Sequence, residues 1–241
     1  LIDRPGVTTI VTVQSAVAAL VSLQSAEPLS VTGGSIAVSE SSELNGGLLM
    51  SGGSLGGAGN LTLGSSSFWT GGNSSGPGGL IVQPSAALSV SSPGAPGVLD
   101  RTLTNNGFVS WDQPTLTLTG GAQLINRPGA VVTVQGNLTI TNASGGPAAL
   151  TNEGTLIKSG PGGPLTLNNL SFVTSGAVVL RVGDPTDAIS ANAGGTLGGV
   201  LNIDVQPGFV PTEGATFNLF AFSNRTGTFA QILSGTQPYS P

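Results

Sequence analysis

The chain has 241 residues, of which only 7 % are charged, and its 11 acidic and 6 basic side chains give a net charge of −5. Six basic residues cannot form the positive surface that binds a phosphate backbone, so we expect no nucleic-acid partner. The chain has no His and no Cys, which excludes the usual zinc, haem and iron–sulfur sites and all His- or Cys-dependent catalysis; we expect no cofactor.

The composition predicts a folded chain that does not enter a membrane. Apolar residues make up 38 % of the chain and the mean hydropathy is +0.28, whereas disordered chains are poor in apolar residues. The longest candidate for a membrane segment, Val17–Leu23, is far shorter than a spanning helix. Because the chain starts at Leu1 without Met or a basic leader, we expect a mature or excised segment.

Short segments that alternate apolar and small polar residues recur along the chain. This period of two predicts half-buried strands. Glycine pairs between the segments, such as Gly33-Gly34, mark tight corners. Ser15–Leu23 is compatible with a short helix, and otherwise the pattern predicts β-structure throughout. The clearest strands expected, in chain order, are Val11–Val13, Leu61–Leu63, Leu88–Val90, Leu116–Leu118, Leu138–Ile140, Leu165–Leu167 and Leu201–Ile203.

An internal repeat determines the expected architecture. The segments Thr104–Gly136 and Thr151–Gly183 are equally long and share Asn, Gly and apolar positions. A weaker copy precedes them and places Trp69 at the position of Trp111. A repeat of roughly 42–47 residues divides into two coils of about 20–24 residues, a length typical of solenoids.

We therefore predict an all-β fold, a parallel β-solenoid (β-helix) with about ten coils. A β-sandwich and a propeller are the competing architectures, but the propeller signature is missing apart from Trp111-Asp112. Within each coil the alternating apolar residues should stack as ladders. The core ladder is expected to include Val109, Leu116, Leu118, Val131, Leu156, Leu165, Leu167 and Val178.

The end of the chain departs from the repeat. We expect solenoid repeats over residues 1–198, with the clearest units at 59–103, 104–150 and 151–198. The remaining residues, 199–241, form a divergent β segment that holds five of the eight Phe residues. Large aromatic side chains would cover the open end of a core, so this segment either caps the solenoid or docks another subunit.

The repeat units resemble those of a known class of proteins. The residues that carry the likeness are Asn105–Val109, Asn152–Leu156 and the Leu-Thr-Leu triplets, within Gly33–Gly183. They resemble the right-handed parallel β-helices of secreted bacterial proteins, among them autotransporter passengers and filamentous-haemagglutinin-like adhesins. The resemblance implies an extracellular or cell-surface location and a structural or adhesive role.

Catalysis has few candidate residues. Glycoside hydrolysis needs two carboxylates across a cleft, and the acidic residues are scattered. Glu40 with Glu43 is one local pair, and Asp112 and Glu153 occupy adjacent repeats, where they are expected near one face. Without His and with a single Lys, the chain offers no evident acid–base pair, and we expect that it is not an enzyme.

Three sets of residues are candidate binding sites, each with a structural alternative. Asp184 and Asp187 either bind Ca²⁺ or cap a tight turn. Trp69 and Trp111 either stack on sugars or pack against neighbours. Arg127 either grips an anionic glycan or precedes a repeated type II turn. An ice-binding face would need regular Thr ranks, which the repeats do not maintain.

The ends of a solenoid expose unpaired strand edges, and neither end of this sequence is strongly charged. The sequence therefore predicts a non-catalytic extracellular structural protein that associates head to tail with copies of itself: a stalk, filament subunit or adhesin module. The alternative is a β-helix that binds or cleaves host or matrix glycans. The residues expected at the contacts between copies are Leu1, Ile2, Val11, Val13, Phe217, Phe220 and Phe222.

Overall fold

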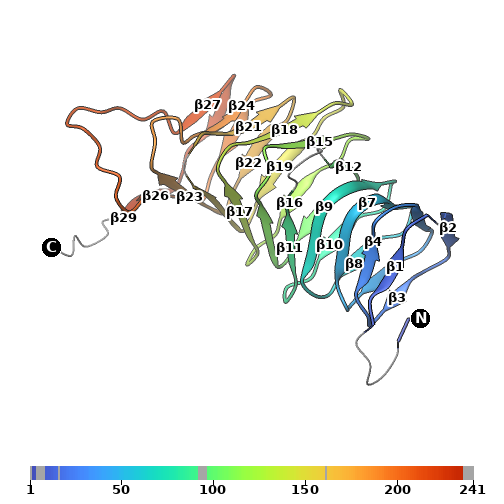
Figure 1. The fold of residues 1–241 in the computed structure, drawn as a ribbon. Helices are drawn as coiled ribbons and strands as arrows, with labels where there is room; N and C mark the ends of the chain where they lie inside the picture. The colour runs from blue at the N-terminus through green and yellow to red at the C-terminus, as the bar shows by residue number, and fades with distance from the viewer. Residues whose placement is uncertain (1, 4–8, 16, 92–96, 161, 236–241) are drawn as a thin grey trace.

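The computed structural model describes residues 2–3, 9–15, 17–91, 97–160 and 162–235. These residues form an elongated parallel β-solenoid, with β1 near one end and β29 near the other (Figure 1). Every strand pairs in parallel with the equivalent strand of a neighbouring coil. No described residue lies in a helix, and thus none lies in a helix that could span a membrane. The predicted all-β solenoid is confirmed.

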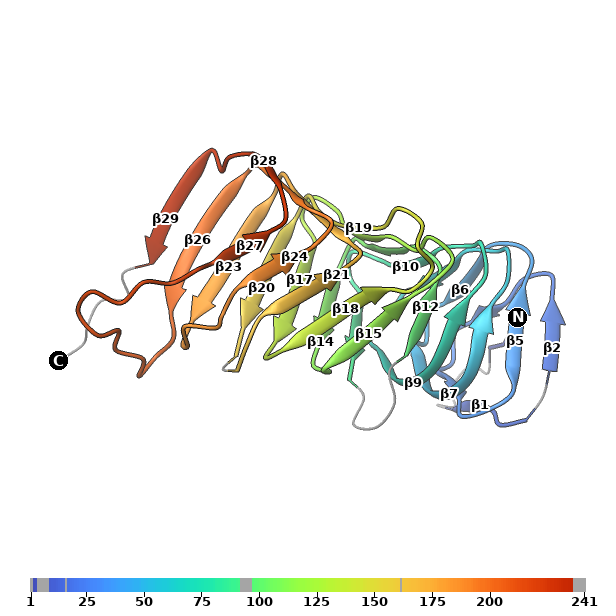
Figure 2. The ribbon, with the colours of Figure 1, turned by 90° about the horizontal axis from the view of Figure 1, so that it is seen from above.

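Each coil runs through three faces, which we number in chain order. Faces 1 and 2 together form a 19-stranded sheet and face 3 a 10-stranded sheet. Figure 2 shows the strands of faces 1 and 2 stacked in order along the rod. Face 1 contains β1 (Val11–Val13), β4 (Leu29–Val31), β7 (Leu48–Gly56), β9 (Ser67–Ser75), β11 (Ala87–Val90), β14 (Phe108–Trp111), β17 (Val131–Gln135), β20 (Thr155–Ser159), β23 (Ala177–Val182), β26 (Val200–Val205) and β29 (Gln231–Gly235).

Strands β7 and β9 are long enough to continue from face 1 into face 2. The other strands of face 2 are β2 (Val17–Leu20), β5 (Ser35–Val38), β12 (Val98–Asp100), β15 (Thr115–Leu118), β18 (Leu138–Asn142), β21 (Leu165–Asn168), β24 (Ile189–Ala191) and β27 (Phe220–Phe222).

Face 3 receives one strand from each coil, so its ten strands agree with the predicted coil number. They are β3 (Gln24–Ser25), β6 (Ser42–Leu44), β8 (Leu61–Leu63), β10 (Leu80–Val82), β13 (Leu103–Asn105), β16 (Leu124–Asn126), β19 (Ala149–Asn152), β22 (Ser171–Thr174), β25 (Gly195–Leu197) and β28 (Arg225–Gly227).

The coils lengthen along the chain. Near the start of the chain, the coil from Leu29 to its partner Leu48 is shorter than the later coil from Val131 to its partner Thr155. The last coil, from Val200 to its partner Gln231, is longer again, because the loop 206–219 projects between β26 and β27 (Figure 1). The sequence repeat that starts at residues 104 and 151 is thus two coils, as predicted. Strands β26 to β29 continue the three faces beyond residue 198. The boundary between the solenoid repeats and a separate C-terminal segment at that residue therefore stays a prediction.

The core is the set of inward ladders, and one predicted member is wrong. Seven of the eight predicted residues are at most 1 % exposed, but Val131 is only half-buried and points outward. Its neighbours Val132 and Val134 point inward instead, and Val132 stacks on Leu156. The stretch Val131-Val132-Thr133-Val134 has apolar residues of both parities, so alternation alone does not determine its inward side.

A ladder of asparagines fastens the corner between face 3 and face 1. Asn105 Nδ2 donates to Asn126 Oδ1 over 2.9 Å, Asn126 Nδ2 to Asn152 Oδ1 over 2.8 Å, and Asn152 Nδ2 to Thr174 Oγ1 over 3.1 Å. All four side chains are buried. Each Asn Nδ2 also donates to a backbone carbonyl at the start of the face 1 strand in the following coil, at Val131, Thr155 and Ala177.

This corner also requires glycine. A Cβ atom on Gly154 would collide with the backbone carbonyl oxygens of Arg127 and Ala130 in the preceding coil. A Cβ atom on Gly107 would likewise collide with the backbone carbonyl oxygens of Gln83 and Ala86 in the preceding coil. The Asn-x-Gly signature of the repeat therefore has a physical reason: the Asn stacks inside the corner, and the Gly lets two coils approach closely.

Candidate functional site

The two tryptophans expected to bind sugars lie inside the core. Trp69 and Trp111 are inward residues of β9 and β14 and are 3 % and 2 % exposed. Both stack in register on Val90 of the coil between them. Neither ring presents a face to solvent, so the prediction of a sugar-stacking strip is wrong and the packing alternative holds. Alternation from Val109 already places Trp111 on the inward side.

Arg127, the third glycan candidate, lies at the surface in the turn between β16 and β17. Its Nη1 is 3.1 Å from Glu153 Oε2, and the two side chains are 46 % and 32 % exposed. An ion pair this open to solvent contributes little to stability. The guanidinium is accessible, but the two tryptophans that were the other glycan candidates are buried.

Asp112 and Glu153 do not share a face. Asp112 follows β14, at the corner between faces 1 and 2, whereas Glu153 follows β19, at the corner between faces 3 and 1. The expected proximity is therefore wrong, because the two turns lie at different corners of the coil. These two carboxylates cannot form the acid and nucleophile pair of a glycosidase.

The loop between β23 and β24 contains the two aspartates considered as a Ca²⁺ site. Asp184 Oδ1 accepts hydrogen bonds from Thr186 Oγ1 (2.6 Å) and Thr186 N (2.8 Å), which lower the pKa of Asp184. Asp187 Oδ2 accepts from the backbone N–H groups of Gly183 (2.8 Å) and Asp184 (2.9 Å). Both carboxylates thus cap turn amides. Within the described ranges no three acidic residues cluster as metal ligands would.

Asp187 has a second partner that the sequence reasoning missed. Its Oδ1 lies 3.6 Å from Nζ of Lys158, and the side chains are 2 % and 0 % exposed. Lys158 is an inward residue of β20, stacked between Val134 below and Leu180 above. Burial lowers the pKa of Lys158, although the nearby Asp187 carboxylate opposes the shift. The alternation Thr-Leu-Ile-Lys-Ser signals the inward lysine, but nothing in the sequence signals its partner.

Among the described residues, Arg101 is the other buried cation. It is 2 % exposed, and its Nη2 donates to the backbone carbonyls of Gly57 (2.8 Å) and Gly59 (3.3 Å), two coils away. Burial lowers its pKa to about 10. The side chain therefore fastens the corner between faces 2 and 3, and we assign it a structural role.

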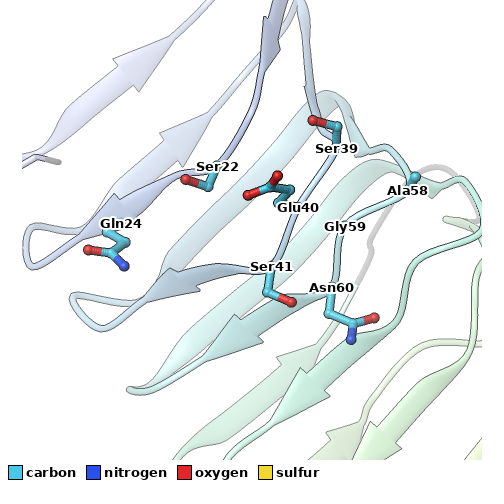
Figure 3. Close-up of a pocket in the computed structure, with 8 residues that line it drawn as sticks. All are labelled: Ser22, Gln24, Ser39, Glu40, Ser41, Ala58, Gly59 and Asn60. Carbon is cyan, nitrogen blue, oxygen red and sulfur yellow. The ribbon is translucent and has the colours of Figure 1, made fainter.

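A shallow polar groove crosses three coils near the β1 end, at the corner between faces 2 and 3 (Figure 3). Its volume is about 560 Å³. Glu40 is the one ionisable side chain among the described residues that line it, so the groove lacks the second carboxylate that glycoside hydrolysis needs. Its hydroxyl and amide groups can form hydrogen bonds with a polar ligand. The lining residues are Ser22, Gln24, Ser39, Glu40, Ser41, Ala58, Gly59 and Asn60.

The two ends of the rod hold most of the residues expected in assembly contacts. Ile2 bridges to Ser25, Val11 and Val13 lie on β1, and all three are half-buried against the core. Leu1 lies outside the described residues. At the opposite end Phe220 and Phe222 are the inward residues of β27, with ring centroids 5.7 Å apart.

Phe217 differs from the other two candidate phenylalanines. It packs edge-on against Phe209 within the projecting loop, with centroids 6.0 Å apart, and is not part of the terminal strand layer. The sequence reasoning missed Ile232 of β29. This residue stacks above buried Leu201 at an inward position, yet it is 63 % exposed because no described coil covers it.

Comparisons of the chain with protein-family models, curated proteins and solved structures found no match.

The arrangement supports packing better than chemistry. Arg101 binds backbone carbonyls, Asp184 and Asp187 cap turn amides, and Arg127 pairs with Glu153. Apart from Lys158, the other buried polar side chains among the described residues are the asparagine ladder with Thr174, together with Ser25, Glu27, Ser42, Ser67, Ser74, Gln113 and Asn142. Inward apolar positions of the first and last described coils, among them Val13, Phe222 and Ile232, are only partly covered.

Proposed function

We propose that this chain is a non-catalytic structural rod of a secreted protein, acting outside the cell or at its surface as a stalk, filament subunit or adhesin module. One observation carries the proposal: a single core runs through all the described coils, and no described coil covers its first or last layer. Such an architecture holds two points a fixed distance apart. Ten coils at the spacing of paired strands give a length of roughly 50 Å.

The open ends support association between copies. Strands β1 and β2 pair only with β4 and β5 among the described residues, and β27, β28 and β29 pair only with the coil below. Each free edge presents unpaired N–H and C=O groups. The first layer of one copy can add to the last layer of another, a head-to-tail contact that repeats without closing.

The proposed location outside the cell rests on the resemblance of the repeat units to secreted bacterial β-helices. The low charge is compatible with close packing of neighbouring rods, because a chain with 7 % charged residues repels its copies weakly. Where a longer polypeptide continues the rod at these ends, its own next coil takes the place of the second copy.

The assembly proposal predicts that the chain with these ends forms linear polymers that Ile232→Asp blocks. The substitution places a charge at an inward position of the last layer, where stacking would bury it unpaired. Negative-stain electron microscopy and sedimentation velocity measure the assembly. Val210→Asp is the matched control, since Val210 is 69 % exposed in the projecting loop and should not affect polymers.

Discrete monomers of the unsubstituted chain at high concentration would contradict the assembly proposal. Equal loss of polymers in both variants would also contradict it, because an added charge would then block assembly whether or not it lies in the last layer.

The proposal also predicts no cleavage of polysaccharides. Pectin and alginate incubated with the chain should release no reducing ends or unsaturated products, because the groove near β1 offers Glu40 alone, and Asp112 and Glu153 lie at different corners of the coil. Turnover that disappears in Glu40→Gln, or in Asp112→Asn or Glu153→Gln, would instead favour the glycan-cleaving alternative.

A further inference from the structure

The Lys158–Asp187 pair is unusual because an apolar core surrounds it. Lys158 stacks between Val134 and Leu180, and both charged side chains are at most 2 % exposed. The 3.6 Å between Nζ and Oδ1 is longer than a hydrogen bond. Neither atom has a hydrogen-bond partner among the described residues. A buried ammonium with unsatisfied donors is costly, and an ion pair of this kind does not recover the full cost of desolvation.

We propose that Lys158 and Asp187 react to form an intramolecular amide between Nζ of the lysine and Cγ of the aspartate. The inference concerns the chemistry of one chain and does not depend on the proposed assembly.

The reacting atoms are close and held by the fold. Nζ faces Oδ1, so Cγ is at most one carbon–oxygen bond further from the amine than Oδ1 is. Lys158 is fixed by β20 and Asp187 by the loop between β23 and β24, one coil further along. A nucleophile and a carboxyl group held in contact react as if at very high concentration, since their entropy of association has already been lost on folding.

Burial favours the reactive form of the lysine. It disfavours the charged ammonium and lowers the pKa of Lys158, although the Asp187 carboxylate opposes the shift. In the proposed step the proton of the ammonium passes to Oδ1, which leaves a neutral amine and a carboxylic acid. A neutral amine is the nucleophile that amide formation needs.

The other carboxyl oxygen already has its donors. Oδ2 of Asp187 accepts from the N–H groups of Gly183 at 2.8 Å and Asp184 at 2.9 Å. When Nζ attacks Cγ, negative charge develops on Oδ2, and these two donors stabilise it as an oxyanion hole does. The C–Oδ1 bond then breaks, a second proton from Nζ joins the leaving hydroxyl, and one water is released. Ammonium plus carboxylate thus gives amide plus water, with no oxidant or co-reactant.

Mass spectrometry tests the bond directly. The folded chain, purified and then denatured, should be lighter by one water than the mass of its sequence. A chymotryptic digest should contain Lys158 and Asp187 in one branched peptide, identified by fragmentation. Lys158→Met and Asp187→Ala should each restore the full mass. Glu153→Gln, which changes a surface carboxylate outside the pair, should keep the deficit of one water.

Two results would overturn the inference. The first is the full sequence mass for the unsubstituted chain after incubation in its folded state, which would leave the pair as a non-covalent ion pair. The second is a mass deficit that fragmentation assigns to another position, such as dehydration at an Asp elsewhere. Both are read from the unsubstituted chain, so they hold even if the variants fail to fold.

Discussion

Leu118→Asp should leave the chain unfolded or aggregated. Leu118 is fully buried on β15 and stacks in register on Leu99 of the coil below. A Leu to Ala change in a core costs about 2–5 kcal/mol. Asp adds to this the burial of a charge that has no partner, which is costlier still. Far-UV circular dichroism and size-exclusion chromatography measure the loss of β-structure and of the monodisperse species.

Thr117→Asp is the matched control, because Thr117 is the adjacent residue of β15 and points outward. It should keep the β-sheet spectrum and lower stability only slightly. If Leu118→Asp gave the same spectrum and the same urea midpoint as Thr117→Asp, the inward ladder of face 2 would be contradicted.

Asn126→Asp should destabilise the fold strongly although the two side chains have the same shape. Asn126 is 1 % exposed, and its Nδ2 donates to Asn152 Oδ1 and to the carbonyl of Thr155. Asp removes both donors, which leaves two buried acceptors unsatisfied at about 1–3 kcal/mol each. It also places a carboxylate beside Asn152 Oδ1. We expect a marked fall in the urea midpoint at neutral pH.

The effect of Asn126→Asp should shrink as the pH falls. Protonation of the new carboxyl group removes the charge and restores one donor to the ladder. Asn106→Asp is the control: Asn106 is only partly buried and donates one hydrogen bond, to Val82 O over 3.2 Å. Equal losses of stability for the two variants would show that the ladder has no special role at this corner.

Much of the fold was predictable because a period of two reports directly on which side of a strand is buried. Leu116, Leu118, Leu165 and Leu167 alternate with Thr, and all four lie in the core. Val131 was wrongly predicted to point inward. It lies in the stretch Val131–Val134, where apolar residues occupy both sides of the strand and alternation does not show which side is buried. The mean coil length was predictable from the long sequence repeat. The repeat spans two coils, and after two coils the chain reaches the same corner again even when the two coils differ in length.

The candidate sites were less predictable. Residue type suggested that Trp69 and Trp111 bind ligands. Both alternate with outward residues along their strands, which places their rings in the core. Lys158 has the parity of a core residue, yet its partner Asp187 is distant in the sequence, in a turn of the next coil. A contact of this kind depends on how successive coils stack, which the local pattern of residues does not reveal.

The direction of the strands determines how the rod would respond to tension. All three faces run across the long axis, so the hydrogen bonds between coils point along it (Figure 2). A pull applied at the two ends therefore opens these bonds in series, peeling coils from an end rather than shearing whole strands past one another. Each peeled coil of roughly 20 residues releases about 65–70 Å of extended chain. A rod built in this way yields in steps and can dissipate a sudden load.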